Sequence, residues 1–126
     1  MNIIVCAKQV PDPEAPPATF KIDPATNKVI PPPGLPPVIS PFDLQAVEAA
    51  LRLKDAVGGE ITVISLGINL LRDVVKKPLA MGADKLILLE DPAFVDGDSW
   101  STAYALSMAI KKRPGWRQAR SRWRCL

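Results

Sequence analysis

The stretch ISPFDLQAVEAALRLKDAVGGEITVISLG, residues 39–67, decides the fold, because it predicts a helix followed at once by a strand. Ser40 can cap the helix, and Pro41 suits its first position. Asp43, at the third position, can complete a pair like a capping box and favours the positive helix end. The predicted helix runs from there to about Val57.

The rest of this stretch indicates how the helix and the strand pack. Glu48 and Arg52 are spaced to pair on one helix face, and Gly58-Gly59 ends the helix. ITVISLG, residues 61–67, is nearly all apolar and predicts a buried strand. The other helix face carries an apolar stripe made of Leu44, Val47, Ala50 and Leu51.

Two more strands and two more helices are predicted outside this unit. NIIVCA, residues 2–7, is apolar on both faces, as a central strand of a parallel sheet is. KLILLE, residues 85–90, predicts another strand. Residues 69–81 predict one amphipathic helix that Pro78 should kink or fray in its last turn. A last helix over about 100–112 would be capped by Asp98 or Ser99 and carry the stripe Ala103, Leu106 and Ile110.

Residues 8–38 form a proline-rich insert between the first strand and the first helix. Proline fixes φ and removes a backbone donor, which excludes a long helix here. Within the insert, TFKID (19–23) and NKVI (27–30) flank PAT, and this pattern predicts a short edge hairpin.

The order strand, hairpin insert, helix, strand, helix, strand, helix is typical of an α/β protein with a parallel sheet and helices on both faces. Strand order 3-2-1, counted along the chain, is the simplest arrangement. The sheet is incomplete, and its apolar first strand is left as an open edge, which favours aggregation unless another segment pairs with it. A ligand is expected beyond the carboxyl ends of the strands, beside the first strand.

Length and composition describe one soluble globular domain: 126 residues, 48% of them hydrophobic and 23% charged. No apolar run is long enough for a membrane span and the N-terminus lacks the features of a secretory signal, so we expect a cytoplasmic protein. Cys6 and Cys125 give no disulfide framework. The absence of histidine excludes Ser/His and Cys/His catalysis and most transition-metal sites.

The net charge of +3 divides unevenly along the chain. Residues 1–110 hold nine basic and thirteen acidic side chains, whereas residues 111–126 hold seven basic and none acidic. We interpret residues 113–126 as a basic tail without regular structure, unlike the domain at 1–112, and a change of reading frame near Lys112 explains it best. A solvated tail and a nucleic-acid-binding arm are the other interpretations, and nucleic acid is the less favoured partner.

Few residues face the predicted rim of the sheet. Neither GxGxxG nor GxxxxGK[ST] occurs, so a glycine-cradled pyrophosphate is not expected. The helix start at 40–43 has free N–H groups that could receive a phosphate or lie beside an adenine, or it is a plain N-cap. Ser65-Leu66-Gly67 could approach a ligand with its backbone or be only a turn. Lys8 could meet an anion or stay solvated, and Cys6 is most simply a small buried hydrophobic residue.

Four acidic residues lie at the end of the third strand or in the loop after it, without the alternating spacing of a calcium loop. Caps and turns explain them, and no residue in the chain is typical of a general base or a nucleophile. The four are Glu90, Asp91, Asp96 and Asp98.

Five segments, in this order and at these spacings, carry a resemblance: VCAKQVPDPE, KIDPATNKV, ISPFDLQAVEAALRLKD, GGEITVISLG and LAMGADKLILLEDPAF. Together they resemble the beta subunit of electron transfer flavoprotein, over residues 1 to about 112. The resemblance implies a Rossmann-like nucleotide-binding sheet and a heterodimer with the alpha subunit. It also implies a carrier of electrons from dehydrogenases to a quinone reductase, nitrogenase or other acceptor, and not an enzyme that converts a substrate.

The resemblance implies two nucleotides. In the common members of the family the beta subunit holds AMP and the alpha subunit holds FAD, whereas in electron-bifurcating relatives the beta subunit holds a second FAD at the AMP position. KQVPD, residues 8–12, looks more like the second group. Carried over position by position, the family's nucleotide contacts fall on Cys6, Ser40, Pro41, Phe42, Asp43 and Leu66.

The chain also departs from the family. The DGDTAQVGP-like nucleotide loop has no counterpart, since Asp96-Gly97-Asp98 is an earlier loop, and the chain is well short of the family's usual length. Ser40 stands where asparagine is usual, and Pro78 stands where a helix-compatible residue is usual. Two alternatives follow: an inactive truncated product, and a stand-alone adenine-nucleotide-binding regulatory module of the universal-stress-protein kind.

Overall fold

The computed structural model describes residues 1–112, in which three parallel strands form the central sheet. The strands, in spatial order, are β1 (Asn2–Cys6), β6 (Glu60–Gly67) and β7 (Lys85–Glu90). The register places Cys6 beside Ile64, so the carboxyl ends of β1 and β6 lie at the same end of the sheet. The strand order and the incomplete α/β class are those that the sequence predicts.

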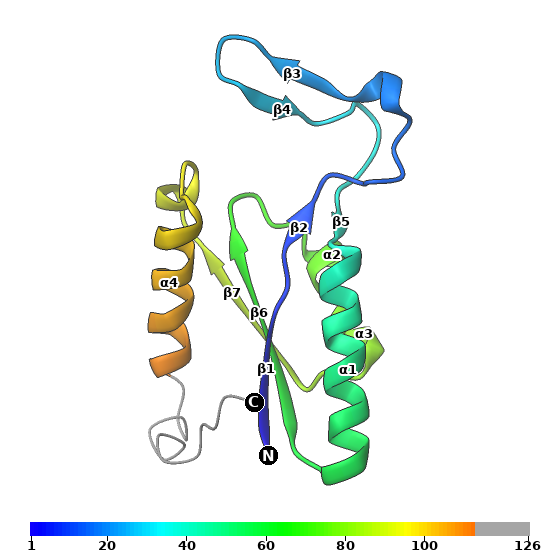
Figure 1. Ribbon diagram of the computed structural model, residues 1–126, viewed down its shortest axis with the longest axis vertical. Helices are drawn as coiled ribbons and strands as arrows, with labels where there is room; N and C mark the ends of the chain where they lie inside the picture. The colour runs from blue at the N-terminus through cyan, green and yellow to red at the C-terminus, as the bar shows by residue number, and fades with distance from the viewer. Residues whose placement is uncertain (113–126) are drawn as a thin grey trace.

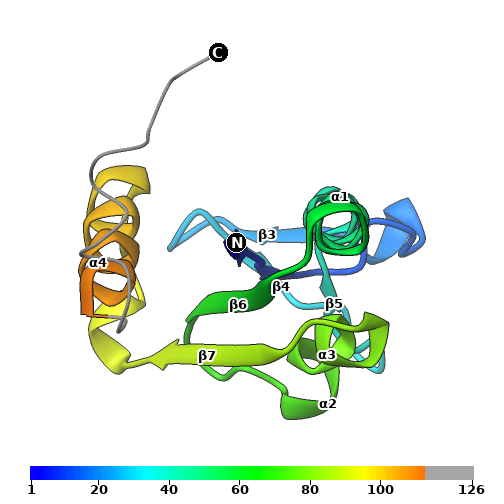
Figure 2. The ribbon, with the colours of Figure 1, turned by 90° about the horizontal axis from the view of Figure 1, so that it is seen from below.

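Helices cover both faces of this sheet (Figure 1 and Figure 2). One face carries α1 (Pro41–Val57), α2 (Arg72–Val75) and α3 (Lys77–Met81), and the other carries α4 (Ser99–Lys112). Two 3-10 turns, η1 (Pro17–Thr19) and η2 (Pro92–Phe94), lie in the connections. Within residues 1–112, every helix is too short or too polar to span a bilayer.

Both ends of α1 lie where the sequence predicts them. Ser40 Oγ accepts the N–H of Asp43 at 3.4 Å, which makes Ser40 the N-cap. Gly58 has φ 70° and donates its N–H to the carbonyl of Lys54. A left-handed residue of this kind ends a helix at little cost only when it is glycine.

The predicted faces of α1 are also confirmed. Glu48 and Arg52 form the expected ion pair at 3.1 Å on the outer face. On the inner face, Val47 and Ala50 are buried against the sheet, and Leu44 and Leu51 pack at the margin of the same core.

The helix predicted over 69–81 is wrong in its bounds. The chain forms two short helices instead, and the first begins only at Arg72, because Asn69 has a left-handed φ of 52°. Pro78 lacks the N–H that would reach back one helical turn, so the helix breaks at Lys76. Pro78 then occupies the first turn of α3, where proline is tolerated, and its side chain is buried.

The helix α4 begins at Ser99 and is capped by Asp98, whose Oδ1 accepts the Ser101 N–H at 2.8 Å. Of its predicted stripe, Leu106 and Ile110 are half-buried as expected, but Ala103 is exposed. No residue of α4 is fully buried, so this helix covers its face of the sheet more loosely than α1 does.

The insert extends beyond the carboxyl ends of the strands, at the top of Figure 1. The predicted hairpin is present as β3 (Lys21–Asp23) and β4 (Lys28–Ile30). The sequence did not reveal a second pairing, in which β2 (Gln9–Val10) and β5 (Val38–Ile39) run antiparallel. This pairing closes the insert at its base and returns the chain to the start of α1.

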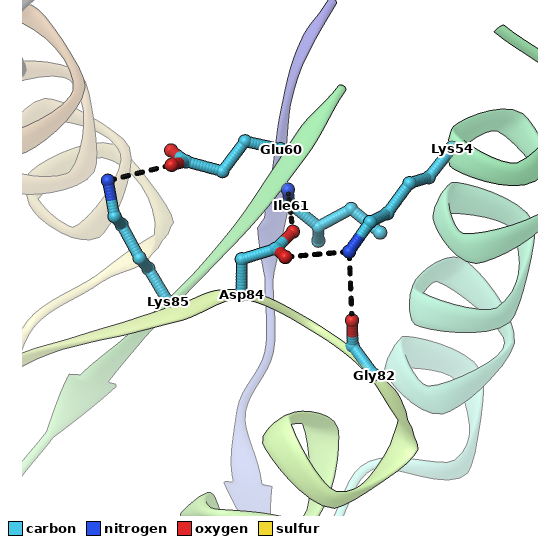
Figure 3. A network of polar contacts seen from close by, with 6 residues as sticks. All are labelled: Lys54, Glu60, Ile61, Gly82, Asp84 and Lys85. Carbon is cyan, nitrogen blue, oxygen red and sulfur yellow. Dashed lines mark hydrogen bonds and ion pairs between the residues drawn. The ribbon is translucent and has the colours of Figure 1, made fainter. Parts of the chain in front are cut away.

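A polar network joins α1, β6 and β7 at the other end of the strands, where β6 and β7 begin (Figure 3). Asp84 accepts the N–H of Ile61 at 2.8 Å and pairs with Lys54 at 2.7 Å. The N–H of Ile61 first, and the ammonium group of Lys54 second, hold the pKa of Asp84 below its ordinary value. Lys85 and Glu60 add an ion pair at 2.8 Å.

β1 hydrogen-bonds to β6 alone within residues 1–112, so its other edge is open there, as predicted. The basic tail predicted at residues 113–126 lies outside the described residues.

Candidate functional site

A pocket of about 610 Å³ opens at the carboxyl ends of β1 and β6, the upper end of the sheet in Figure 1. The first turn of α1, the connection between β7 and α4, and α4 itself complete its walls. Its volume is within the range of small-molecule sites in proteins. Apolar walls come from Ile64, Leu66, Phe94 and Leu106, and polar atoms come from Cys6, Gln9, Ser40, Asp43 and Thr102.

Two hydrogen bonds tie the start of α1 to Lys8, which follows β1. Asp43 Oδ2 accepts the Lys8 N–H at 2.8 Å, and the Ser40 N–H is donated to the Lys8 carbonyl at 2.9 Å. The N-cap bond between Ser40 and Asp43 lies within the start of α1 itself. The predicted capping-box pair is therefore wrong in one half: the Asp43 carboxylate turns to Lys8, because the Ser40 N–H already has a partner in β1's continuation.

Cys6 lies at the pocket, and its exposed side chain corrects the sequence interpretation of a buried residue. The surrounding atoms still remove part of the hydration of the thiol. This desolvation, and to a smaller degree the negative charge of Asp43, raise the pKa of Cys6. The thiol is consequently neutral near pH 7 and offers a ligand a weak polar contact rather than a nucleophile.

The structure brings four of the six predicted nucleotide contacts together. Cys6, Ser40, Asp43 and Leu66 line the pocket. Pro41 and Phe42 do not, and both are exposed, with 80% of the Phe42 surface accessible.

The two other rim candidates are only partly in the site. Lys8 lines the pocket, as do Leu66 and Gly67 of the segment 65–67. Ser65 is buried and does not line the pocket, because alternate residues of a strand face opposite sides of the sheet.

Sequence reasoning missed the half of the pocket that comes from distant segments. Gln9 enters from β2, and α4 crosses the sheet to bring its own side chains opposite β1. No short motif marks these positions: Gln9 is placed by β2, and only the tertiary position of α4 and the loop before it brings the others near Cys6. They are Gln9, Phe94, Val95, Gly97, Thr102 and Leu106.

The four acidic residues near β7 serve caps and tertiary contacts. Asp91 accepts the Ala93 N–H, and Asp98 caps α4 as predicted. The other two reach further: Glu90 accepts the Leu70 N–H, and Asp96 pairs with Lys28 of the hairpin. In the part of the chain that the structure describes, no group of three or more Cys, Asp or Glu residues could hold a metal ion.

The pocket combines apolar walls with one acidic side. Apolar side chains such as Leu66 and Leu106 line the pocket and offer packing surface to a planar ring. The Asp43 carboxylate only accepts hydrogen bonds, so it favours hydroxyl or amino groups and disfavours a phosphate beside it.

Comparison with known proteins identifies the family of the chain. Residues 34–116 match the family described as "Electron transfer flavoprotein domain". Protein FixA of Azorhizobium caulinodans is 44% identical over 112 residues, which cover 89% of this chain and 38% of that protein. Electron transfer flavoprotein subunit beta of Megasphaera elsdenii is 48% identical over 113 residues, covering 89% of this chain and 40% of that protein.

A further relative, electron transfer flavoprotein subunit beta of Thermoanaerobacterium thermosaccharolyticum, is 46% identical over 112 residues, covering 89% of this chain and 41% of that protein. The chain thus spans about two fifths of the length of the relatives that it matches. Since the family match covers more than half of the sequence, the chain belongs to the electron transfer flavoprotein domain family.

Proposed function

We propose that this chain is the nucleotide-binding part of a beta-type electron transfer flavoprotein, which carries electrons and does not convert a substrate. It binds an adenine nucleotide, AMP or FAD, in the pocket at the carboxyl ends of β1 and β6. One observation carries the proposal: the positions that the family resemblance assigns to the nucleotide, Cys6, Ser40, Asp43 and Leu66, line that same pocket.

The residues present fit an adenosine group. The adenine ring packs between Leu66 and the α4 side chain Leu106, while Asp43 accepts hydrogen bonds from the ribose hydroxyls or the exocyclic amine. Gly67 and Gly97 present bare backbone to the same pocket, which allows a phosphate to approach away from Asp43. FAD, when bound, supplies a flavin that takes up and releases electrons, and the chain's own residues bind and orient it.

The partners follow from the family. We propose a heterodimer with an alpha subunit that shares or holds FAD, and electron flow from dehydrogenases to a quinone reductase or another acceptor. The similarity to Protein FixA and to electron transfer flavoprotein beta subunits supports this role. Between AMP and a second FAD, the segment 8–12 favours FAD. A cytoplasmic location is part of the same proposal.

Calorimetric titration of the full chain with AMP, FAD and ATP tests the binding. We expect AMP or FAD to bind with a micromolar dissociation constant, about −8 kcal/mol. Leu66→Trp should abolish binding because the larger side chain fills the pocket. A folded chain that binds none of the three would identify an inactive product, and a preference for ATP would favour the regulatory module.

Leu53→Ala provides the matched control, since Leu53 is an exposed residue of α1 outside the pocket. We expect the affinity of this variant to equal that of the unmodified chain. Phe42→Ala tests the family's contacts at Pro41 and Phe42: a clear loss of affinity would show that the nucleotide extends past the pocket mouth onto the first turn of α1.

A further inference from the structure

The loop that follows β6, residues 68–71, forms one wall of the pocket through Ile68 and Leu70 although it has no strand or helix of its own. Asn69 holds a left-handed φ of 52°, a conformation that few residues other than glycine adopt. Leu70 is buried, with 6% of its surface exposed. A loop of this shape needs partners for its backbone polar groups.

Gln9 supplies two of these partners from the other side of the pocket. Its Nε2 donates to the Asn69 carbonyl at 3.3 Å, and its Oε1 accepts the Leu71 N–H at 2.9 Å. A single side-chain amide thus bonds to the backbone as a neighbouring strand would. Gln9 itself is anchored in β2, which pairs with β5 just before α1.

Glu90 supplies the third partner from the end of β7. Its Oε1 accepts the Leu70 N–H at 2.8 Å, and its Oε2 pairs with Arg72 at 2.9 Å. The ion pair turns the carboxylate toward the loop. Three successive backbone groups, the Asn69 carbonyl and the two N–H groups after it, are therefore bonded to two side chains from opposite sides.

We propose that Gln9 and Glu90 are positioning residues that set the backbone of 69–71 in the shape that nucleotide binding requires. The inference rests on the proposed function, because the ligand is the nucleotide of that pocket. Both side chains act through the loop, and Gln9 also lines the pocket itself: when they are lost, Ile68 and Leu70 leave the pocket wall and the nucleotide loses contact with it. The affinity for AMP or FAD consequently depends on residues that the family's nucleotide contacts do not include.

Amide hydrogen exchange of the full chain, without any ligand, tests the contacts themselves. Gln9→Leu keeps the size of the side chain but removes both hydrogen bonds, so the Leu71 amide should exchange faster while the Leu70 amide stays protected. Glu90→Ala should release the Leu70 amide, and Glu90→Gln, which keeps an acceptor oxygen, should restore its protection. Unchanged exchange at both amides would overturn the inference.

Calorimetric titration of the same variants tests the consequence for binding. We expect Gln9→Leu and Glu90→Ala to weaken nucleotide binding by about tenfold. Gln9→Glu, which still accepts the Leu71 N–H, and Glu90→Gln should each bind more tightly than the variant at the same position that lacks the acceptor. If the substitutions only destabilised the fold, the two variants at each position would bind equally weakly. Gln45→Leu, the same change on the exposed side of α1, is the control and should bind normally.

The outcomes separate the two proposals. If the unmodified chain binds a nucleotide and Gln9→Leu binds it equally well, the positioning role is wrong and the proposed function stands. If the unmodified chain binds neither AMP nor FAD, the proposed function fails and the positioning role fails with it, even where the exchange data show the contacts.

Discussion

Asp84 connects the start of β6 to α1 through one carboxylate, which accepts the Ile61 N–H and pairs with Lys54. Because these contacts lower the pKa of Asp84, its contribution to stability is present above the ordinary aspartate value of 3.8 and is lost as the pH falls below it. Asp84→Asn should therefore be less stable than the unmodified chain at pH 7, and the difference should shrink in the acidic range.

Urea denaturation at pH 7 and at pH 3 measures this difference. Asp55→Asn, at an exposed position of α1, is the matched variant without the contacts of Asp84 and is measured at both pH values. A gap for Asp84→Asn that is as large at pH 3 as at pH 7 would mean that the charge of Asp84 does not contribute.

Two isoleucines, one buried and one exposed, show how the effect of the same substitution depends on burial. Ile61 is completely buried in β6, whereas Ile22 in the hairpin has 55% of its surface exposed. Ile61→Val should lower the free energy of unfolding by about 1 kcal/mol, because removing a buried methylene leaves a small cavity. Ile22→Val should change it by less than about 0.5 kcal/mol. Equal effects in chemical denaturation would contradict the burial described here.

At the scale of single residues, the sequence predicts contacts that are local and misses those that are not. The Ser40 cap, the Glu48–Arg52 pair and the Asp98 cap each depend on residues within four positions, and all three are present. The bond of Asp43 to Lys8 spans 35 positions. No spacing rule reports a contact of that range, so the capping-box prediction for Asp43 was wrong.

The joint between α1 and β6 depends on two glycines that play different roles. Both have positive φ, 70° for Gly58 and 131° for Gly59. A Cβ on Gly58 would meet open space, whereas a Cβ on Gly59 would overlap the carbonyl oxygen of Met1, beside which β6 begins.

Alanine substitution should therefore separate backbone conformation from close packing. Gly58 has φ 70° and ψ 173°, a backbone conformation that is essentially restricted to glycine, so Gly58→Ala should lower the free energy of unfolding by about 1–3 kcal/mol. Gly59→Ala should lower it by more than about 3 kcal/mol, above the range of backbone strain alone, because Met1 must move. Thermal and urea unfolding of both variants measure the difference, and similar values would show that β1 yields easily.

At the scale of elements, periodicity finds the three parallel strands and the two long helices. It fails over 69–81, where the apolar spacing is helical but Asn69 and Pro78 divide the segment. It also misses β2 and β5, since two-residue strands carry no period. A pocket lies at the carboxyl ends of the strands, where parallel topology predicts the ligand. The side of the pocket formed by α4 could not be predicted in this way, because it depends on how α4 packs across the sheet.

At the scale of the whole molecule, the open edge of β1 is the feature with the widest consequence. Ile3, Ile4 and Val5 give this strand an apolar character on both faces, yet within residues 1–112 it pairs on one side only. Unpaired N–H and C=O groups along such an edge are a template for another chain. We predict that the chain self-associates through β1 as its concentration rises.

Proline substitution tests this prediction one backbone donor at a time. The N–H of Ala7 points to β6, where it is donated to the Ile64 carbonyl at 2.9 Å. Because N–H directions alternate along a strand, the N–H of Ile3 also faces β6 and that of Ile4 faces the open edge. Ile4→Pro should thus keep the fold and shift the chain to monomer in sedimentation velocity experiments.

Two further variants identify the cause. Ile3→Pro, one position away, removes a donor to β6 and should destabilise the sheet instead of blocking association. Ile4→Ala shortens the side chain but keeps the N–H, so it should associate more than Ile4→Pro does. Ile4→Pro removes the Ile4 N–H, a donor that a strand paired with the open edge of β1 would use. If this variant associates as strongly as the unmodified chain, contacts other than the β1 edge hold the copies together.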